Sequence, residues 1–225
     1  QRQMCIRDRD GTLLDGDGNI PSQLWPLLET MRDRAIAFVP ASGRQCTTLS
    51  TMFGSHLQGM PIIAENGTYV VRDGVDISSS TIDPNLTREV ITGVRQLRND
   101  GHDVGLVVAT KSIAYLERGD DPFVSHVATY YHSHRIVKDL SEHTDDVIKL
   151  SIYDFREASE ATYPTMQRTA PEHQVILATP NWVDIMNPGV NKGSAVEAVQ
   201  RDLGVTADQT AIFGDFLNDL EMMPM

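Results

Sequence analysis

The stretch Asp8-Arg-Asp-Gly-Thr-Leu-Leu14 decides the fold of this 225-residue chain. If the residues before it form a β-strand, the Asp8 and Asp10 side chains stand on one side of it, about 6.5 Å apart along the strand. Carboxylates this close repel each other unless one takes up a proton or a cation lies between them. Gly11 permits a sharp turn directly after the pair. The pattern predicts a ligand site at the carboxyl end of a strand in an open α/β sheet. The alternative is a chance cluster of surface acids.

A second polar segment, Ser42-Gly43-Arg44, follows the apolar run Ile36–Val39. A small hydroxyl group beside backbone N–H groups at a strand-to-helix turn suits a phosphate oxygen. An ordinary Ser-Gly turn or a helix cap explains the same residues at least as well. Taken alone, this segment therefore indicates a phosphate site only weakly.

The third segment is Gly189-Val-Asn-Lys-Gly-Ser194, which places Lys192 at the start of a helix expected over residues 192–203. A cation is disfavoured near the positive end of a helix, so Lys192 is expected to face an anion. A solvated lysine in the first helical turn is the alternative. The segment does not complete the glycine-rich pattern of a P-loop.

The fourth segment is Gly214-Asp-Phe-Leu-Asn-Asp219, which follows a strand expected over residues 210–213. Asp215, Asn218 and Asp219 offer carboxylate and amide oxygens within about one helical turn of each other. Mg²⁺ prefers oxygen ligands of this kind, so the segment favours a magnesium site. Simple capping of a helix by Asn218 or Asp219 is the alternative.

Strand-like and helix-like segments alternate along the chain, a pattern typical of an α/β fold with a parallel sheet. From about residue 84 the sequence pattern changes. The residues beyond this point include a polar, histidine-bearing stretch and a polar helix expected over about 156–169. The opening pattern returns near residue 185. We therefore expect a core of residues 1–83 and 185–225, interrupted by an inserted α+β domain over residues 84–184. Further elements expected are strands at 61–64, 104–109, 147–153, 175–178 and 182–186, helices near 24–31 and from 84, and a hairpin over 69–77.

All four segments fall where a strand ends, so they are expected to converge on one edge of the sheet. Together they resemble the haloacid dehalogenase-like phosphohydrolases, and most closely the Cof-type branch with a large α/β cap between the second and third motifs. Asp8 to Thr12 matches the first motif, Ser42 the second, Lys192 the third and Gly214 to Asp219 the fourth. The resemblance implies a Rossmann-like parallel sheet as the core and an inserted cap domain.

The resemblance also implies a role for each matching residue. Asp8 would be the nucleophile that forms an aspartyl-phosphate, and Asp10 would protonate the leaving group and later activate water. Ser42, Gly43, Lys192 and Asn218 would bind the substrate, with Arg44 a weaker candidate for a third positive charge. The residues expected to hold Mg²⁺ are Asp8, Asp10, Asp215 and Asp219.

Composition excludes several other classes of protein. The chain has 19 basic and 31 acidic residues, a net charge of −12, which argues against a binder of duplex DNA or of anionic membranes. Two cysteines cannot form a disulfide framework, and no apolar run is long enough to span a bilayer. We therefore expect a cytoplasmic protein, either a monomer or a weak homodimer, without nucleic-acid or membrane partners.

The resemblance to this family implies a Mg²⁺-dependent phosphomonoesterase that acts on small phosphorylated metabolites, such as sugar phosphates or phosphorylated cofactor precursors. A phosphosugar mutase of the same superfamily is the alternative among enzymes. A catalytically inactive ligand-binding module is the alternative outside them. The histidines His126, His132 and His134 are expected to be solvated rather than metal ligands.

Both ends of the chain depart from the pattern that the resemblance leads us to expect. Arg7 and Arg9 flank Asp8, where a central parallel strand should be apolar. We therefore expect residues 1–9 to be non-native, with the natural sequence recognisable from about Asp10 onward. The chain stops six residues after Asp219, where relatives are expected to continue, so we expect a truncated chain.

Overall fold

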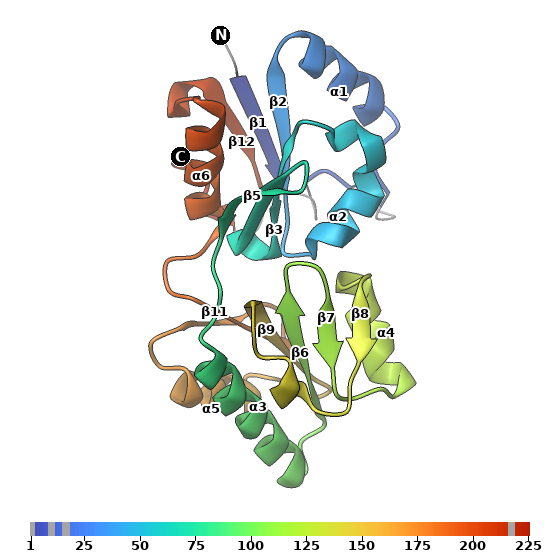
Figure 1. Ribbon diagram of the computed structural model, residues 1–225, viewed down its shortest axis with the longest axis vertical. Coiled ribbons are helices and arrows are strands. Elements are labelled where there is room, and N and C mark those ends of the chain that lie inside the picture. Colours follow the sequence, from blue (N-terminus) through green and yellow to red (C-terminus); the bar gives the residue numbers. More distant parts are fainter. Residues whose placement is uncertain (1–2, 9–11, 15–18, 216–218) are drawn as a thin grey trace. The chain divides into compact units, whose positions relative to one another are not determined.

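The computed structural model describes residues 3–8, 12–14, 19–215 and 219–225, and the chain forms two compact units (Figure 1). The first unit comprises Gln1–Ser79 and Val190–Met225, and the second comprises Ser80–Gly189. Each unit has its own six-stranded sheet. The architecture is thus the expected α/β fold, with a discontinuous first unit and a second unit inserted into it.

The sheet of the first unit is parallel over the strands that carry the predicted site. Strands β12, β1, β2 and β3 run parallel in that order, and β4 and β5 continue the sheet antiparallel. The carboxyl ends of the parallel strands therefore meet at one edge. The strands are β1 (Gln3–Asp8), β2 (Ile36–Ala41), β3 (Pro61–Ala64), β4 (Tyr69–Arg72), β5 (Val75–Ser79) and β12 (Thr210–Phe213).

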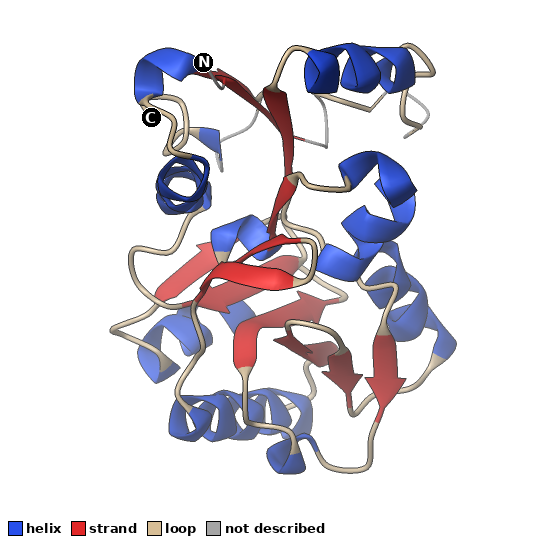
Figure 2. Ribbon diagram, turned by 45° about the horizontal axis from the view of Figure 1, so that its top comes forward, coloured by secondary structure: helices blue, strands red, loops and turns tan. Residues whose placement is uncertain are grey.

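Helices cover both faces of this sheet, with α6 on one side and α1 and α2 on the other (Figures 1 and 2). Neighbouring residues of a strand point to opposite faces. On β2, accordingly, Val39 joins the core beneath α6, whereas the Phe38 ring lies 5.9 Å from the Phe53 ring of α2. The helices are α1 (Leu24–Asp33), α2 (Cys46–Phe53) and α6 (Lys192–Leu203), and short 3-10 turns lie at Gly54–Leu57, Glu65–Gly67 and Ala207–Gln209.

Strand β1 alternates between a buried and a partly exposed face. Met4 and Ile6 are buried in the core beneath α6, whereas Cys5 and Arg7 are half-buried on the other face. The Arg7 guanidinium donates a hydrogen bond to the Thr12 carbonyl at 2.8 Å and lies 5.9 Å from the centre of the Phe213 ring. Arg7 therefore lies in a central strand with one backbone hydrogen bond and one aromatic contact.

The sheet of the second unit is antiparallel except for the pair β7 and β8. Its strands pair in the order β10, β11, β9, β6, β7, β8. Their bounds are β6 (Val104–Thr110), β7 (Ala114–Leu116), β8 (His134–Ile136), β9 (Val147–Asp154), β10 (Gln174–Leu177) and β11 (Trp182–Met186). The helices are α3 (Pro84–Asn99), α4 (Asp121–Tyr130) and α5 (Thr162–Thr169), with a 3-10 turn at Leu140–Glu142.

Strand β6 separates two hydrophobic cores in this unit. Leu106 and Val108 belong to the core that α3 and α5 cover, and Val107 and Ala109 face the core that α4 covers. Most expected strands and helices are confirmed, but α4, β7 and β8 lie in the stretch where only a polar segment was expected. The helix expected over 156–169 begins only at Thr162, because the Asp154 carboxylate accepts hydrogen bonds from Arg156 N and Thr162 Oγ1 and holds the intervening residues in a turn.

Candidate active site

Described residues of the four predicted segments lie at neighbouring positions on the carboxyl edge of the first sheet. Asp8 is the last residue of β1 and pairs in register with Ala41, the last residue of β2, so Ser42 follows immediately beside it. Asp215 lies two residues beyond β12, and Lys192 is the first residue of α6. The parallel pairing of β12, β1 and β2 brings together residues that are far apart in the sequence.

Lys192 is the centre of the polar contacts at this edge. Its ammonium donates hydrogen bonds to Asp8 Oδ1 and, at 2.6 Å, to Asp219 Oδ1. Asp8 is 4% exposed, and Lys192 and Asp219 are each 1% exposed. Charged groups are buried to this extent only when they are paired. Lys192 was expected to face an anion, and in this structure it faces two, the carboxylates of Asp8 and Asp219.

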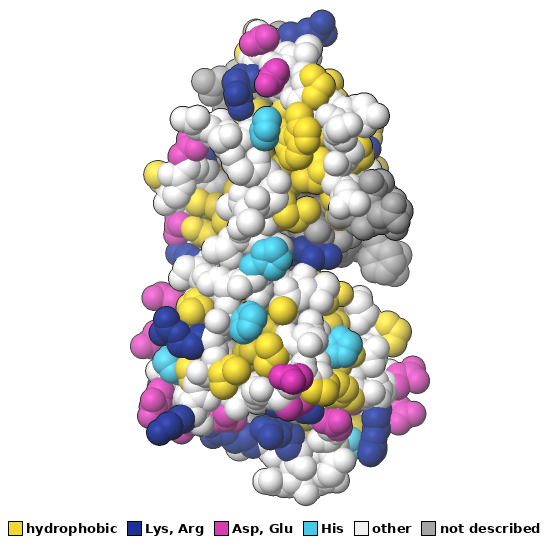
Figure 3. Space-filling view, turned by 90° about the vertical axis from the view of Figure 1, so that its right-hand side faces the viewer, with side chains coloured by type: hydrophobic (Ala, Val, Ile, Leu, Met, Phe, Trp, Pro, Cys, Tyr) yellow, Lys and Arg dark blue, Asp and Glu magenta, His cyan; other side chains and the backbone are white. Residues whose placement is uncertain are grey.

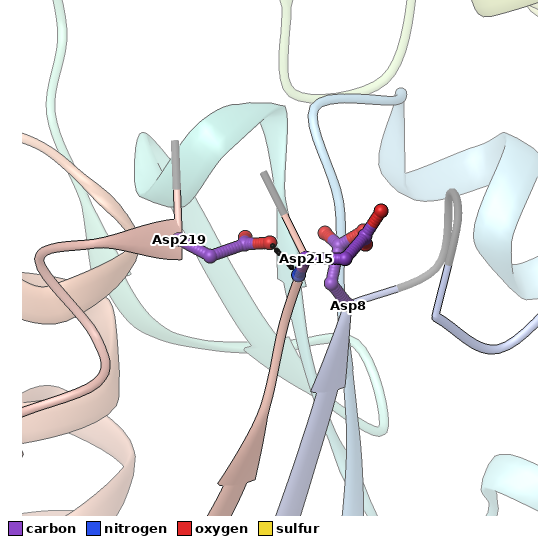
Figure 4. Close-up of side chains that lie close together, drawn as sticks. All are labelled: Asp8, Asp215 and Asp219. Atoms are coloured by element: carbon purple, nitrogen blue, oxygen red, sulfur yellow. Dashed lines mark hydrogen bonds between the residues drawn. The ribbon is translucent and has the colours of Figure 1, made fainter. Parts of the chain in front are cut away.

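Three carboxylates, those of Asp8, Asp215 and Asp219, lie close together at this edge (Figure 4). Asp8, Asp215 and Asp219 each offer an oxygen, and these oxygens lie within 4.8 Å of one another. With all three ionised, one ammonium leaves two negative charges to be balanced. Hard oxygen ligands with this charge suit Mg²⁺. Within the part of the chain that the structure describes, this is the one group of side chains with such spacing.

A continuous set of hydrogen bonds orients the two aspartates that follow β12. Thr12 Oγ1 donates to Asp215 Oδ1 at 2.6 Å, and the Asp215 backbone N–H donates to Asp219 Oδ2 at 3.1 Å. Asp215 itself is exposed, whereas Asp219 is buried. Sequence reasoning did not single out Thr12, although it lies inside the opening motif, because its hydroxyl partner is 203 residues away.

Ser42 is buried at the end of β2, with its backbone held on both sides. Its N–H donates to the Ile63 carbonyl at 3.0 Å, and its own carbonyl accepts from Asn66 N at 3.0 Å. Ser42 Oγ accepts a hydrogen bond from Arg44 N at 3.1 Å, so the hydroxyl also closes the turn. The turn-forming explanation is therefore correct for this contact, and it places the hydroxyl beside the end of β1.

The start of α6 is held by a capping box that sequence reasoning missed. Asn191 Oδ1 accepts from Ser194 N at 2.9 Å, and Ser194 Oγ accepts from Asn191 N at 3.1 Å. The Asn-x-x-Ser spacing is a recognisable signal for such a cap. The cap fixes the first turn of the helix and thereby the position of Lys192. Asp10 and Asn218, also predicted site residues, lie outside the described residues.

The second unit has a separate cavity of about 450 Å³. Its walls carry one lysine, Lys111, against the acids Glu142, Asp145 and Asp146, beside a stacked pair of Tyr115 and His143 rings 4.2 Å apart. Among the described residues, these acids do not bring their carboxylate oxygens close enough together to share one cation, as Asp8, Asp215 and Asp219 do. The features that suit a phosphoryl group therefore belong to the first unit.

Histidine side chains on the second unit are scattered among hydrophobic and neutral side chains on the face shown in Figure 3. His126 stacks on Tyr153 at 4.3 Å and shares a 3.2 Å hydrogen bond with its hydroxyl. The His134 ring bonds the Tyr131 carbonyl at 2.8 Å. These two histidines are thus engaged by neighbouring aromatic residues. No helix in the described ranges has both the length and the apolar character needed to cross a membrane.

Comparisons with known proteins identify relatives over nearly the whole chain. The 5-amino-6-(5-phospho-D-ribitylamino)uracil phosphatase YbjI of Escherichia coli is 26% identical over 223 residues, covering 96% of this chain and 79% of the relative. The HMP-PP phosphatase of Cronobacter sakazakii is 23% identical over 221 residues, covering 97% of this chain and 79% of the relative.

A haloacid dehalogenase-like hydrolase from Bacteroides thetaiotaomicron has a similar crystal structure, with a TM-score of 0.85 and 20% identity over 99% of this chain and 85% of that chain. This likeness shows the fold. The sequence profile of one family, described as haloacid dehalogenase-like hydrolase, matches residues 5–225. The resemblance inferred from the four motifs is therefore confirmed, and the chain belongs to the haloacid dehalogenase-like hydrolase family.

Proposed function

We propose that this chain is a Mg²⁺-dependent phosphatase that hydrolyses small phosphorylated metabolites through an aspartyl-phosphate formed on Asp8. The observation that carries the proposal is the buried contact of Lys192 with Asp8 and Asp219 inside a cluster of three carboxylates. Phosphoryl transfer depends mainly on positioning and on neutralising charge. A fixed ammonium beside a carboxylate nucleophile supports both.

The first half of the reaction transfers the phosphoryl group to the chain. A carboxylate oxygen of Asp8 forms a bond to phosphorus while the bond from phosphorus to the ester oxygen of the substrate breaks. Asp10 donates a proton to the departing oxygen, which leaves as an alcohol. The products of this half are the alcohol, the aspartyl-phosphate and an ionised Asp10.

The second half releases phosphate and restores the side chains. Asp10, now ionised, takes a proton from a water molecule as the water oxygen bonds to phosphorus. The bond from phosphorus to the Asp8 oxygen breaks, so inorganic phosphate leaves and Asp8 is again a carboxylate. One water is consumed in each cycle, and no oxidant or reductant is required.

The residues present fit a Mg²⁺ ion. Asp8, Asp215 and Asp219 have carboxylate oxygens close enough to share one cation and would hold it, together with the main-chain carbonyl of Asp10. When bound, Mg²⁺ supplies positive charge next to the phosphoryl oxygens. Ser42, Gly43, Lys192 and Asn218 would hold the remaining phosphoryl oxygens. A chain with a net charge of −12 can in this way bind an anionic substrate at a site where Mg²⁺ and Lys192 offset the carboxylate charges.

The relatives support a small phosphorylated substrate. The Escherichia coli relative is named for a phosphorylated ribitylaminouracil and the Cronobacter relative for HMP-PP. We extend to this chain only the shared chemistry, a phosphate group on a small metabolite such as a sugar phosphate or a cofactor precursor. We further propose that the protein acts in the cytoplasm, as a monomer or weak homodimer, without nucleic-acid or membrane partners.

The proposal is tested by measuring phosphate release from an aryl phosphate and then from a panel of phosphometabolites, with Mg²⁺ and with a chelator. We expect release with Mg²⁺, loss of release with the chelator, and a loss of about 10³-fold or more in Asp8→Asn. An Asp8→Asn variant within tenfold of the wild type would exclude Asp8 as the nucleophile. An isomerised phosphosugar without free phosphate would indicate the mutase, and binding without turnover would indicate the inactive module.

A further inference from the structure

The turn Glu65–Gly67, which follows β3, has an unusual backbone. Three consecutive residues have positive φ angles, 52° at Glu65, 57° at Asn66 and 96° at Gly67. Left-handed conformations are disfavoured for residues other than glycine by roughly 1 kcal/mol or more each. Such a turn persists only when its surroundings hold it in place. Its contacts therefore indicate what the conformation is for.

On one side the turn holds the segment that contains Ser42. The backbone N–H of Asn66 donates to the Ser42 carbonyl at 3.0 Å, and that of Glu65 donates to the Arg44 carbonyl at 3.0 Å. A Cβ added to Gly43 would lie 2.9 Å from Asn66 Oδ1, so the Asn66 side-chain amide packs directly on this glycine. The turn thus holds both the backbone and the surface of the Ser42-Gly43 segment.

On its other side the turn touches the start of α6. A Cβ added to Gly67 would lie 2.2 Å from the Asn191 carbonyl oxygen and 3.1 Å from Lys192 N. Only a glycine fits at this distance, and its φ of 96° is one that other residues rarely adopt. Thr68 Oγ1 closes the turn with a 3.0 Å hydrogen bond to the Glu65 carbonyl. The same three residues therefore lie between Ser42-Gly43 and Lys192.

We propose that Asn66 is a positioning residue for the phosphoryl-binding site, acting through Gly43 and Ser42, while Gly67 sets the spacing to Lys192. The inference rests on the proposed function, because it assigns to Ser42, Gly43 and Lys192 the binding of phosphoryl oxygens. Asparagine is among the few residues that tolerate a left-handed backbone. Either asparagine or glycine would therefore satisfy the backbone conformation at position 66. The packing of the amide on Gly43 is what glycine at this position could not provide.

The decisive variant is Asn66→Gly, which keeps the left-handed backbone accessible but removes the amide. The probe is inorganic phosphate, measured on the full chain with Mg²⁺ by calorimetry and as an inhibitor of aryl phosphate hydrolysis. We expect the dissociation constant for phosphate and the KM for the aryl phosphate to rise by about fivefold or more. A fivefold rise corresponds to the loss of a contact worth roughly 1 kcal/mol. The melting temperature should stay within a few degrees of the wild-type value.

A second variant, Asn66→Asp, keeps the shape and the backbone preference of Asn66 but adds a negative charge beside Gly43. It should weaken phosphate binding more than Asn66→Gly, because like charges repel. Asp73→Gly is the matched control: Asp73 also has a positive φ, 50°, but it lies in the turn between β4 and β5. This control variant should have the same dissociation constant for phosphate as the wild type.

The results separate the two ideas. If the wild type binds phosphate and both Asn66 variants have the same dissociation constant for phosphate as the wild type, the positioning role is overturned. The proposed function is then unaffected. A wild type that neither binds phosphate nor hydrolyses esters would overturn the proposed function, and the positioning role with it. If Asn66→Gly melts far below the wild type, the comparison of Asn66→Asp with Asp73→Gly decides the question.

Discussion

Lys192 and Asp219 form a buried ion pair in which Nζ lies 2.6 Å from Oδ1, and each residue is 1% exposed. The pair connects the first residue of α6 to the segment that follows β12. Because the same ammonium also contacts Asp8, the lysine is a fixed counter-ion for carboxylates from two different strand ends. This relationship makes the charge of Lys192 part of the folded core as well as of the proposed reaction.

Lys192→Met should destabilise the first unit markedly, because it leaves Asp8 and Asp219 buried without their cation. The expected loss is about 3–5 kcal/mol, as for other buried pairs that lose one partner. Mg²⁺ should restore more stability to the variant than it adds to the wild type, since it supplies the missing charge. Urea unfolding with and without Mg²⁺ measures both effects. Lys138→Met, at an exposed position of the second unit, serves as control. Equal stability of Lys192→Met and the wild type would show that the ion pair contributes nothing.

Thr12→Val should weaken Mg²⁺ binding, because the valine cannot hold Asp215 Oδ1 as the threonine hydroxyl does at 2.6 Å. Loss of one such hydrogen bond is worth about 1 kcal/mol, or roughly fivefold in the Mg²⁺ dissociation constant. Thr12→Ser, which keeps the hydroxyl, should bind Mg²⁺ like the wild type. Asp215→Ala should raise the Mg²⁺ requirement further. Titration calorimetry with Mg²⁺ alone measures all three variants, and identical constants for Thr12→Val and Thr12→Ser would argue against this role of the hydroxyl.

Gly105→Ala should destabilise the second unit, because the added Cβ would lie 2.3 Å from the buried Phe123 ring. Overpacking of this kind typically costs about 1–3 kcal/mol. Gly93→Ala is the matched comparison: its Cβ would meet the end of the Met166 side chain at 3.2 Å and Thr169 Oγ1 at 3.5 Å, and it lies within α3. Alanine is the better helix former by up to about 1 kcal/mol, so this variant should be neutral or stabilised. Thermal unfolding measures the melting temperature of both variants. Equal melting temperatures would contradict this prediction.

Neither cysteine should react readily in the folded chain. Burial raises the pKa of the Cys5 and Cys46 thiols above its ordinary value, and for Cys46 the charge of Glu65 adds to the effect. Because the thiolate is the reactive form, a higher pKa leaves less of it at neutral pH. Alkylation by iodoacetamide at pH 7.5 should therefore be slow in buffer and much faster in urea. Rapid alkylation of the native chain would contradict the burial of both thiols.

Sequencing of the gene tests the expectation for residues 1–9. Strand β1 lies between two parallel neighbours, a position where both faces are usually apolar. We expect the natural gene to encode an apolar stretch upstream of Asp10. Recovery of the present Arg7 and Arg9 from genomic DNA would reject this expectation.

Local chemistry made much of the fold predictable. The hairpin turn at Asp73-Gly74 is confirmed, with positive φ angles of 50° and 78° that suit these residue types. The α6 helix and the strands 61–64 and 210–213 begin and end where expected, because apolar runs and turn residues mark them. By contrast, α4 was missed because the surrounding stretch is polar and rich in histidine, although Phe123 and Val127 form its buried face, Asp120 caps it and Pro122 occupies its first turn.

The sequence by itself determined that four polar segments follow strand ends and resemble one hydrolase family, because each motif is a short run of neighbouring residues. The tertiary structure alone decided which of them touch: Lys192 bonds Asp8 across 184 positions, and Thr12 bonds Asp215 across 203. It also placed the 65–67 turn between Ser42-Gly43 and Lys192. No local sequence pattern predicts these contacts of the turn. The physical reason is that parallel strand pairing sets which strand ends are neighbours, and that pairing depends on how the whole sheet packs beneath α6.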